Sequence, residues 1–408
     1  MVIEKGVLYM YIDLFAGCGG LSLGLYNAGI KGLFAVEKNS DAFSTLEANL
    51  IEKNDHFDWP IWLEKKNLDI TVLLKDYRDE LRELKGNVDI IVGGPPCQGF
   101  SMAGQRKHND SRNHLVDAYI EFVSLVQPEI LFFENVHGFT VGFKKVENGK
   151  EVRDIPVSVL LIDKLKKFGY EVESEVINMS EYGVPQKRKR FILCASKSKN
   201  PAFFFESLKN NRESFLFSKG IRNSVTIKQA IGDLEKKNGY TPSIDSINFM
   251  NGNYGTRRSA YQRLMRKNIS KKACPDSHRF AKHKDSTISL FKSLMDNTEE
   301  AIRVTPSMKI VEGLKKRGVT PLKPSSICPT ITSIPDDFIH YSEPRIMTVR
   351  EHARIQSFPD DFIFKGKYTT GGNRRKFEVP RYTQVANAVP PLFAEQVGLI
   401  LQEMIDNE

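Results

Sequence analysis

Residues 10–20 read Met-Tyr-Ile-Asp-Leu-Phe-Ala-Gly-Cys-Gly-Gly, and this stretch decides the fold. The apolar residues 8–15 predict a buried strand, and the glycines that follow allow a tight turn in which the backbone can approach a ligand. A helical pattern begins at Leu21 and is predicted to stop near Gly29. Strand, glycine loop and helix in this order are typical of the first unit of a doubly wound α/β domain.

An acidic residue closes the next predicted strand. Residues 33–36 are apolar, and Glu37 follows them. In doubly wound sheets an acidic side chain at this position hydrogen-bonds the hydroxyls of a ribose. The glycine spacing is not GxGxxG, so a nicotinamide cofactor and S-adenosylmethionine are both open at this point. Asp69 and Ile70 are interpreted either as the end of a third strand, near the adenine, or as a surface turn.

Strands and helices alternate along the first half of the chain. Apolar runs predict strands at 88–92 and 130–133 and helices at 119–126 and 159–168, and 171–177 and 191–195 are expected to pair as strands. This alternation predicts a parallel sheet covered by helices on both faces. The polar stretches 51–67 and 141–156 predict exposed loops, and a last helix is predicted over 392–404.

The charge of the chain is distributed unevenly. The 408 residues carry 59 Lys and Arg against 50 Asp and Glu, a formal net charge of +9. Residues 196–330 hold 26 basic and 11 acidic residues, a net of +15, which leaves −6 for the remainder. Ten basic residues and one acidic residue fall within 257–284, with Tyr254 and Tyr261 close by. This pattern indicates nucleic-acid binding, although a solvated lysine-rich face has the same composition.

Composition excludes several classes of protein. Hydrophobic residues make up 40% and charged residues 27% of the chain, which argues against global disorder and against a collagen-like repeat. No apolar run approaches the length needed to span a bilayer. The five cysteines form no CxxC pair, which argues against a disulfide framework and a four-cysteine zinc site and favours a reducing compartment. Cys274, His278 and His283 lack a fourth ligand, so no metal site is expected.

Residues 93–101 read Gly-Gly-Pro-Pro-Cys-Gln-Gly-Phe-Ser. The two prolines restrict the backbone before Cys97 and Gly99 allows a turn after it, which predicts an outward side chain at the carboxyl end of a strand. Glu134 follows another apolar strand and is expected in the same crevice. In the extended segment 186–190, alternation is expected to place Arg188 and Arg190 on one face.

The order of these motifs resembles that of the DNA (cytosine-5)-methyltransferases over almost the whole chain. Residues 13–20 resemble the motif DLFAGxGG, 93–101 the PCQ motif, 134–136 the ENV motif and 186–190 the QxRxR motif. Residues 110–115, 345–359 and 384–391 resemble three further motifs, with Ala386 where the family usually has glycine. The resemblance implies a doubly wound, Rossmann-like S-adenosylmethionine-dependent methyltransferase domain with a smaller basic target-recognition domain.

The resemblance also implies roles for individual residues. Cys97 would add to cytosine C6, Glu134 would hold the N3 edge, and Arg190, with Arg188 behind it, would contact the base carbonyl. The implied contacts to S-adenosylmethionine are Phe15, Ala16, Gly17, Gly19, Gly20, Leu21, Glu37, Asp69, Ile70, Pro95, Leu115, Asn387, Ala388 and Val389. The expected DNA contacts are Gln98, Ser101, Arg112, Arg257, Arg258, Arg263, Arg266 and Lys267.

We expect a discontinuous catalytic domain of residues 1–195 plus 380–408, and a target-recognition domain and hinge of residues 196–379. The expected partner is double-stranded DNA, and the expected product of the cofactor is S-adenosyl-L-homocysteine. A restriction-modification setting with a companion endonuclease is the commonest context for such an enzyme, and a lone regulatory methyltransferase is the alternative. We also expect a cytoplasmic monomer that does not contact membranes. No long segment precedes the catalytic motifs, which favours a prokaryotic or phage enzyme.

Three alternative functions share some of these features. A tRNA cytosine-5 methyltransferase has the same motifs but carries a Cys-Phe-Thr segment that this sequence lacks. A non-catalytic DNA-binding protein on the same fold would not need Cys97, Glu134 and Arg190 together. A thiol-redox enzyme would need a resolving cysteine near Cys97, and none lies nearby in the sequence.

Overall fold

The computed structural model describes residues 9–96, 113–142, 144–147, 150–222, 224–270, 273–312, 314, 318–371, 374 and 377–406. The chain divides into two compact units. Unit 1 comprises Met1–Asn178, Lys189–Arg212 and Ala394–Glu408, and unit 2 comprises Met179–Arg188 and Glu213–Phe393. These boundaries differ from the expected ones at 195/196 and 379/380.

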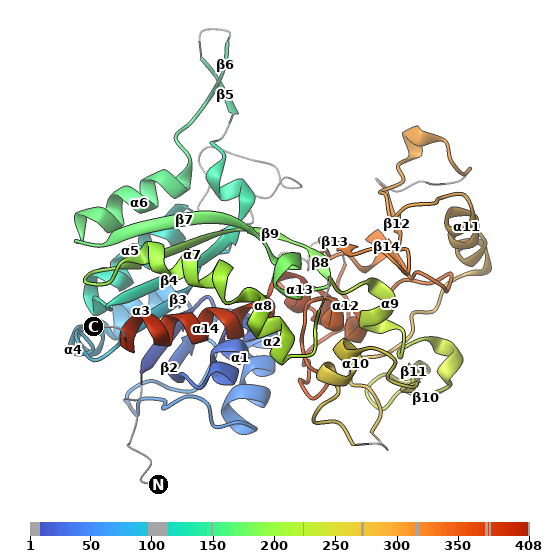
Figure 1. The fold of residues 1–408 in the computed structure, drawn as a ribbon, viewed down its shortest axis with the longest axis horizontal. Coiled ribbons are helices and arrows are strands. Elements are labelled where there is room, and N and C mark those ends of the chain that lie inside the picture. Colours follow the sequence, from blue (N-terminus) through green and yellow to red (C-terminus); the bar gives the residue numbers. More distant parts are fainter. Residues whose placement is uncertain are drawn as a thin grey trace. The chain divides into compact units, whose positions relative to one another are not determined.

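Unit 1 is built on a central sheet with helices on both faces (Figure 1). Its strands are β1 Met10–Leu14, β2 Lys31–Val36, β3 Ile90–Gly93, β4 Ile130–Val136, β5 Lys144–Glu147, β6 Lys150–Arg153, β7 Glu171–Asn178 and β9 Lys189–Ser196. Its helices are α1 Gly20–Ala28, α2 Ser40–Leu46, α3 Ile70–Asp76, α4 Arg78–Glu83, α5 Asn113–Val126, α6 Val157–Lys167, α7 Pro201–Asn210 and most of α14 Pro391–Asp406.

The described strands of the central sheet have the order β2-β1-β3-β4-β9-β7. β1 is parallel to β2 and β3, and β3 is parallel to β4, whereas β9 is antiparallel to both β4 and β7. The predicted α/β sheet is therefore confirmed, but it is mixed rather than wholly parallel. β2 lies on one side of β1, and the next strand along the chain, β3, lies on the other side of β1. The strand order therefore reverses at β1. In such sheets ligands bind at the carboxyl ends of the strands that flank this point.

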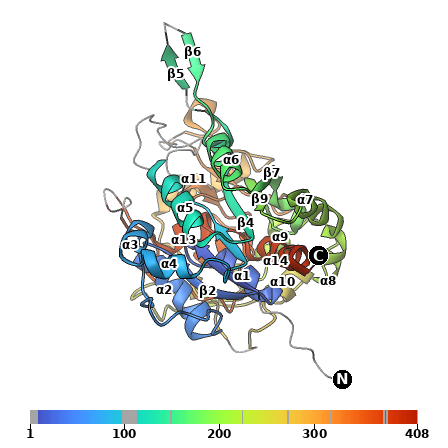
Figure 2. The same ribbon diagram turned by 90° about the vertical axis from the view of Figure 1, so that its left-hand side faces the viewer.

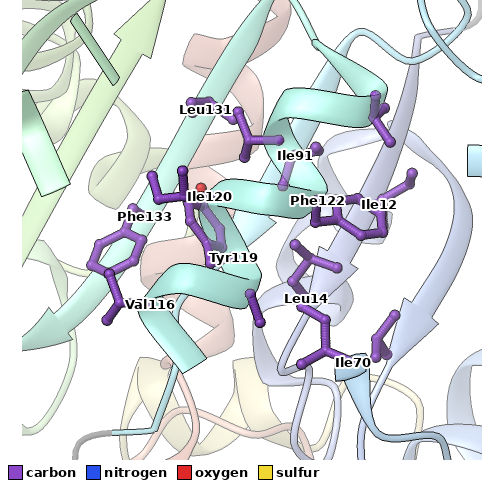
Figure 3. Close-up of a cluster of buried hydrophobic side chains, with 14 of the residues drawn as sticks. Ile12, Leu14, Ile70, Ile91, Val116, Tyr119, Ile120, Phe122, Leu131 and Phe133 are labelled. Carbon is purple, nitrogen blue, oxygen red and sulfur yellow. The ribbon is translucent and has the colours of Figure 1, made fainter. Parts of the chain in front are cut away.

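One face of the sheet is covered by α3, α5 and α6. Figure 3 shows Ile12, Leu14 and Ile91 of the strands against Tyr119 and Phe122 of α5, and all five side chains are buried. Because successive side chains of a strand point to opposite faces, Ile12 and Leu14 share this face. Removing this apolar surface from water is the main source of stability for such a layer.

The other face is covered by helices from distant parts of the chain. Phe204 of α7 packs on Phe132 of β4, with ring centroids 5.7 Å apart, which places α7 in unit 1 rather than in the expected recognition domain. α1 and α14 pack so closely that a Cβ atom on Gly24 would lie 2.2 Å from the Cβ atom of Ala394. Glycine is required there for the carboxyl-terminal helix to dock on the first helix of the fold, and Figure 1 shows the two ribbons side by side.

Three local predictions need correction. Asp69 does not end a strand: its side chain caps the start of α3, accepting from the amide of Thr71 at 2.9 Å. Residues 144–147 and 150–153 pair as strands β5 and β6 where a loop was predicted, and the two strands extend away from the sheet (Figure 2). Glu134 lies inside β4 and not after it, because β9 pairs with β4 as far as Val136.

Unit 2 consists of short elements. Its strands are β8 Gln186–Lys187, β10 Tyr240–Pro242, β11 Met250–Gly252, β12 Thr320–Pro321, β13 Cys328–Pro329 and β14 Phe338–Ile339. Its helices are α9 Ile227–Ile231, α10 Ala260–Met265, α11 Asp285–Asp296, α12 Val349–Ile355 and α13 Arg381–Asn387, and α8 Arg212–Ser218 begins at the boundary with unit 1. β8 pairs with β13, which explains why residues 179–188 belong to unit 2. Among the described helices of either unit, none is long and apolar enough to cross a membrane.

Candidate functional site

The loop after β1 has the backbone conformation that its glycines predict. Phe15, Gly17 and Gly19 have positive φ angles of 60°, 57° and 87°, in the region that favours glycine. A Cβ atom on Gly19 would lie 2.7 Å from a methyl carbon of Leu50, whereas one on Gly17 would meet nothing within 4 Å. Gly19 is thus required for close packing, and the backbone at Gly17 borders open space in which a ligand can approach it.

Glu37 holds this loop in place. Its two carboxylate oxygens accept from the backbone amide of Gly17 at 2.9 Å and from that of Asn39 at 2.7 Å. Burial raises the pKa of Glu37, while the amides of Asn39 and Gly17 act in the opposite direction. The acidic residue predicted at the end of β2 is therefore brought directly to the glycine loop.

Asp13 is the first residue of the motif at 13–20, and the sequence does not indicate an individual role for it. The hydroxyl of Ser22 donates to its Oδ2 at 2.5 Å, but its Oδ1 has no hydrogen-bond partner among the described residues. The side chain is buried, and burial raises its pKa to about 7. A buried carboxylate oxygen without a partner marks a place for a donor from a ligand. The ammonium group of S-adenosylmethionine is such a donor, so the residues around the glycine loop fit this cofactor.

The other expected cofactor residues of unit 1 lie in several settings. Ala16 donates its amide to Val36 at 3.0 Å, Gly20 starts α1, and Leu21 is buried. Ile70 is buried in the core under α3, and Leu115 packs against the same core from α5. Ala16 and Gly20 contribute to the glycine loop through the backbone, and Leu21, Ile70 and Leu115 contribute through packing.

The side chain of Glu134 in β4 pairs with that of Arg190 in β9. Its Oε1 lies 3.0 Å from Nε of Arg190 on the neighbouring strand β9, and both side chains are largely buried. A Cβ atom on Gly94 would lie 2.2 Å from the carbonyl oxygen of Glu134, so glycine allows the segment after β3 to pass directly against β4. Asn135 donates to the carbonyl of Pro95 at 3.2 Å and fixes that segment. Glu134, paired with Arg190, thus lies on the strand along which the backbone that leads into Cys97 passes.

The expected nucleophile lies outside the described residues, as do Gln98, Ser101 and Arg112. The other cysteines can be assessed. Cys18, Cys194 and Cys328 are buried, and burial raises the pKa of the Cys18 thiol to about 12 and those of the other two well above the usual range. Since the thiolate is the reactive form, these three thiols are not nucleophiles.

Arg188 lies in a different environment from Arg190. It is fully buried in unit 2 and donates to the carbonyls of Ala386 at 3.0 Å and Ala388 at 3.1 Å. Gln356 also donates to the carbonyl of Ala388. The chain passes from β8 to β9 at Arg188, so the regular alternation expected over 186–190 does not continue from Arg188 to Arg190. Arg188 and Gln356 are positioning residues for the turn at 387–389, which holds the last expected cofactor residues.

The basic segment of unit 2 exposes most of its expected DNA contacts. Arg257, Arg258, Arg263 and Lys267 are exposed on and around α10. Arg266 is the exception: it is buried, donates to Asp233 at 3.1 Å and to the carbonyl of Gly255 at 2.8 Å, and stacks on Tyr254 at 4.0 Å. We therefore leave Arg266 out of the DNA-contacting set.

Aromatic side chains near this segment are structural. The hydroxyl of Tyr261 is buried and donates to the carbonyl of Arg354 at 2.6 Å. The ring nitrogens of His278 contact the hydroxyl of Thr348 and the carbonyl of Leu234, both at 2.8 Å. Burial lowers the pKa of His278 to about 4, so the side chain is neutral near pH 7.

A buried ion network ties α10 to α12. Asp233 lies 3.1 Å from Arg266 and 3.2 Å from Arg354, and Arg354 pairs in turn with Asp360 at 2.5 Å. Arg354, Asp233 and Asp360 are buried. The exposed arginines around α10 are therefore held on a rigid support.

The family model for C-5 cytosine-specific DNA methylases matches residues 9–403. This chain belongs to the C-5 cytosine-specific DNA methylases. It is 32% identical to the type II methyltransferase M.DdeI of Desulfomicrobium norvegicum over 95% of this chain and 87% of that protein. It is 30% identical to the type II methyltransferase M1.HphI of Haemophilus parahaemolyticus over 98% of this chain and 88% of that protein.

Solved structures show the same fold. A putative DNA modification methyltransferase encoded within an E. coli prophage superposes with a TM-score of 0.62 and 25% identity, covering 98% of this chain and all of that one. The doubly wound methyltransferase fold is thereby confirmed for this DNA methylase, as is its enzymatic class, and family membership implies S-adenosylmethionine as the methyl donor. The open choice between a nicotinamide enzyme and a methyltransferase is settled in favour of the latter.

Proposed function

We propose that this methylase transfers a methyl group from S-adenosyl-L-methionine to C5 of a cytosine flipped out of one specific double-stranded DNA sequence. We also propose that it acts as a cytoplasmic monomer and that the mark protects DNA from a companion restriction endonuclease. The names of the relatives support the restriction-modification setting. The observation that carries the reaction is the Glu134–Arg190 ion pair, which lies on the strand along which the backbone that leads into Cys97 passes.

The residues in this arrangement suit the chemistry of a poorly nucleophilic carbon. The Cys97 thiolate forms a bond to C6, which makes the ring an enamine whose C5 can attack an electrophilic methyl group. Glu134 holds the N3 edge, and Arg190 stabilises the charge that develops on the base. A base then removes the C5 proton, and elimination breaks the bond between sulfur and C6. The bound cofactor supplies the electrophilic methyl group. The target base must leave the duplex, since C6 is inaccessible within the stack.

Methyl transfer to DNA and to tRNA would be compared with tritiated S-adenosylmethionine, followed by bisulfite sequencing of DNA from a host that expresses the protein. We expect incorporation into DNA, at cytosine C5 within one short sequence. Incorporation into tRNA alone would refute the proposed substrate. A protein that binds DNA but labels neither nucleic acid would instead be a non-catalytic DNA-binding protein.

Glu134→Gln should lower kcat by about 10²- to 10³-fold, because an amide cannot exchange a proton at N3 and pairs less strongly with Arg190. DNA affinity should change little, since the side chain contacts only the flipped base. Single-turnover methyl transfer and a DNA-binding titration measure the two quantities. Glu173→Gln, on the exposed side of β7, is the matched control. A kcat within threefold of wild type would remove Glu134 from the mechanism.

Replacing Arg257 and Arg258 together by alanine should weaken DNA binding. The slope of log affinity against log salt should fall by up to about 2, one for each phosphate that the variant no longer neutralises. Both side chains are exposed, so folding should be unaffected. Binding isotherms over a series of salt concentrations test this. The same affinity and slope as the wild type would show that neither arginine contacts DNA.

Asp13→Asn should weaken cofactor binding by about tenfold, since a charge-assisted hydrogen bond is removed. The pKa of Asp13 is raised to about 7 in the folded protein, so stability of the unliganded wild type should fall as pH rises from about 4 to about 7 and then level off. The asparagine variant should lack this decline. Calorimetric titration and thermal unfolding at several pH values test both effects, with Asp41→Asn in α2 as control. Equal cofactor affinity and parallel pH profiles would contradict them.

A further inference from the structure

Two isoleucines of unit 2 are almost fully exposed on one short loop. The loop 243–249 connects β10 to β11, and Ile244 and Ile247 are 102% and 88% exposed. A single exposed isoleucine needs no explanation. Here two isoleucines lie on one loop of seven residues, and no described helix or strand covers their apolar surface.

This loop is held firmly at its base. Asp245 accepts from Arg381 at 2.7 Å and from the hydroxyl of Tyr368 at 3.1 Å. Backbone hydrogen bonds join Ser243 to Phe249 at 2.9 Å and Phe249 to Ser246 at 3.1 Å. The isoleucines are thus presented on an ordered turn, which lowers the entropic cost of binding whatever covers them.

The surroundings of the loop are cationic. Residues 236–284 contain twelve Lys and Arg but only two acidic residues, Asp245 and Asp276. Both aspartates are paired with arginines from outside this segment, Asp245 with Arg381 at 2.7 Å and Asp276 with Arg350 at 3.0 Å. Two of the twelve cations are paired with carboxylates just before the segment, Lys237 with Glu235 and Arg266 with Asp233 at 3.1 Å, and the segment still carries an excess of positive charge.

Cations also lie directly at the loop. Arg279 donates to the hydroxyl of Ser246 at 3.0 Å and stacks on Phe249 at 4.2 Å, and Lys282 lies 5.2 Å from the same ring. A partner that binds this surface must offer negative charge to the cations and apolar groups to the exposed isoleucines. Duplex DNA does so: its phosphates attract the cations, and the C5-methyl of thymine is an apolar group on the base edges of the major groove.

We propose that loop 243–249 enters the major groove of duplex DNA and that Ile244 and Ile247 contact thymine methyl groups there. This proposal rests on the proposed function for its partner and adds residues that read sequence. The exposed arginines around α10 would position the protein on phosphates, whereas the isoleucines cannot bind phosphate and would discriminate between bases.

The test compares two short duplexes of the same sequence, one with thymine and one with uracil, which lacks only the methyl group. The sequence is one that bisulfite sequencing shows to be methylated. Affinity is measured with S-adenosylhomocysteine present, for the wild type, for Ile244→Ser/Ile247→Ser, and for the control Ile61→Ser. Ile61 is 105% exposed in unit 1, so it matches the two isoleucines in type and exposure. Circular dichroism checks that all variants are folded.

We expect the wild type and Ile61→Ser to bind the thymine duplex more tightly, by about fourfold for one methyl contact and about tenfold or more for two. The double variant should bind both duplexes equally. The proposal would be overturned if the wild type bound the thymine and uracil duplexes equally. It would also be overturned if the double variant still preferred the thymine duplex, or lost the same fold of affinity for both duplexes. Unchanged DNA binding in the double variant would also overturn it.

The two proposals fail in distinguishable ways. Absence of methyl incorporation into DNA by the wild type would refute the proposed function. In that case the same comparison of affinities on plasmid fragments, amplified with dTTP or with dUTP, still decides the role of the loop. Normal methylation with no effect of the isoleucines would refute the loop proposal alone.

Discussion

Cys97→Ser is expected to abolish methyl transfer while DNA binding is retained. A hydroxyl is a far weaker nucleophile than a thiolate near neutral pH, and the loss of a covalent nucleophile typically costs about 10⁴-fold or more in turnover. Neither the Glu134–Arg190 ion pair nor the hydrogen bond from Asn135 to Pro95 depends on the sulfur atom. The exposed arginines of unit 2 are also untouched, so the affinity for DNA should stay within about twofold.

Tritium incorporation and a binding titration measure these two properties of Cys97→Ser. Cys274→Ser is the matched control, because Cys274 is the exposed cysteine among those described and lies in the basic segment. It should retain activity close to the wild type. Turnover by Cys97→Ser within a factor of ten of the wild type would refute nucleophilic catalysis by Cys97. Loss of DNA binding in that variant would point to a structural role instead.

Asp233→Ala is expected to destabilise unit 2 by about 3–5 kcal/mol, the cost of breaking a buried ion pair by removing one partner. Asp233 lies 3.1 Å from Arg266 and 3.2 Å from Arg354. Its removal leaves two guanidinium groups in the interior, although Arg354 keeps Asp360. The support of α10 should loosen, and the variant should bind DNA more weakly as a result.

The two tryptophans allow the effect to be localised. Trp59 and Trp62 both lie in unit 1, so urea unfolding followed by tryptophan fluorescence reports that unit. Hydrogen exchange of peptides from 213–393 reports unit 2. We expect faster exchange in those peptides and an unchanged fluorescence midpoint, with Asp296→Ala at the exposed end of α11 as control. A change below about 1 kcal/mol in unit 2 would show that the network contributes little.

Much of unit 1 was predictable because its signals are local. The apolar run before the glycines predicts β1, Gly29 ends α1 with a φ of 90°, and Glu37 follows β2 as expected. The antiparallel β9 was harder, since strand direction depends on how the chain returns to the sheet. Asp69 was misread because a capping aspartate and a residue at a strand end look alike when only neighbouring residues are considered.

The environments of Arg188 and Arg266 could not be predicted from the sequence. Each lies in a basic motif, but their partners are far away along the chain: Arg188 bonds carbonyls of residues 386 and 388, and Arg266 bonds Asp233. A run of basic residues does not reveal which of them is neutralised. The buried Oδ1 of Asp13 was equally hidden, because its isolation depends on everything packed around it.

The methylase family, the order of its motifs and the concentration of positive charge in one segment could all be predicted before the fold was known. They follow from residue type and spacing, which are properties of the unfolded chain as well. Folding establishes which arginines are exposed and which are buried in ion pairs, and it leaves Ile244 and Ile247 exposed on an anchored loop. Burial and pairing arise when distant segments pack together, so they belong to the folded molecule and not to any stretch of its sequence.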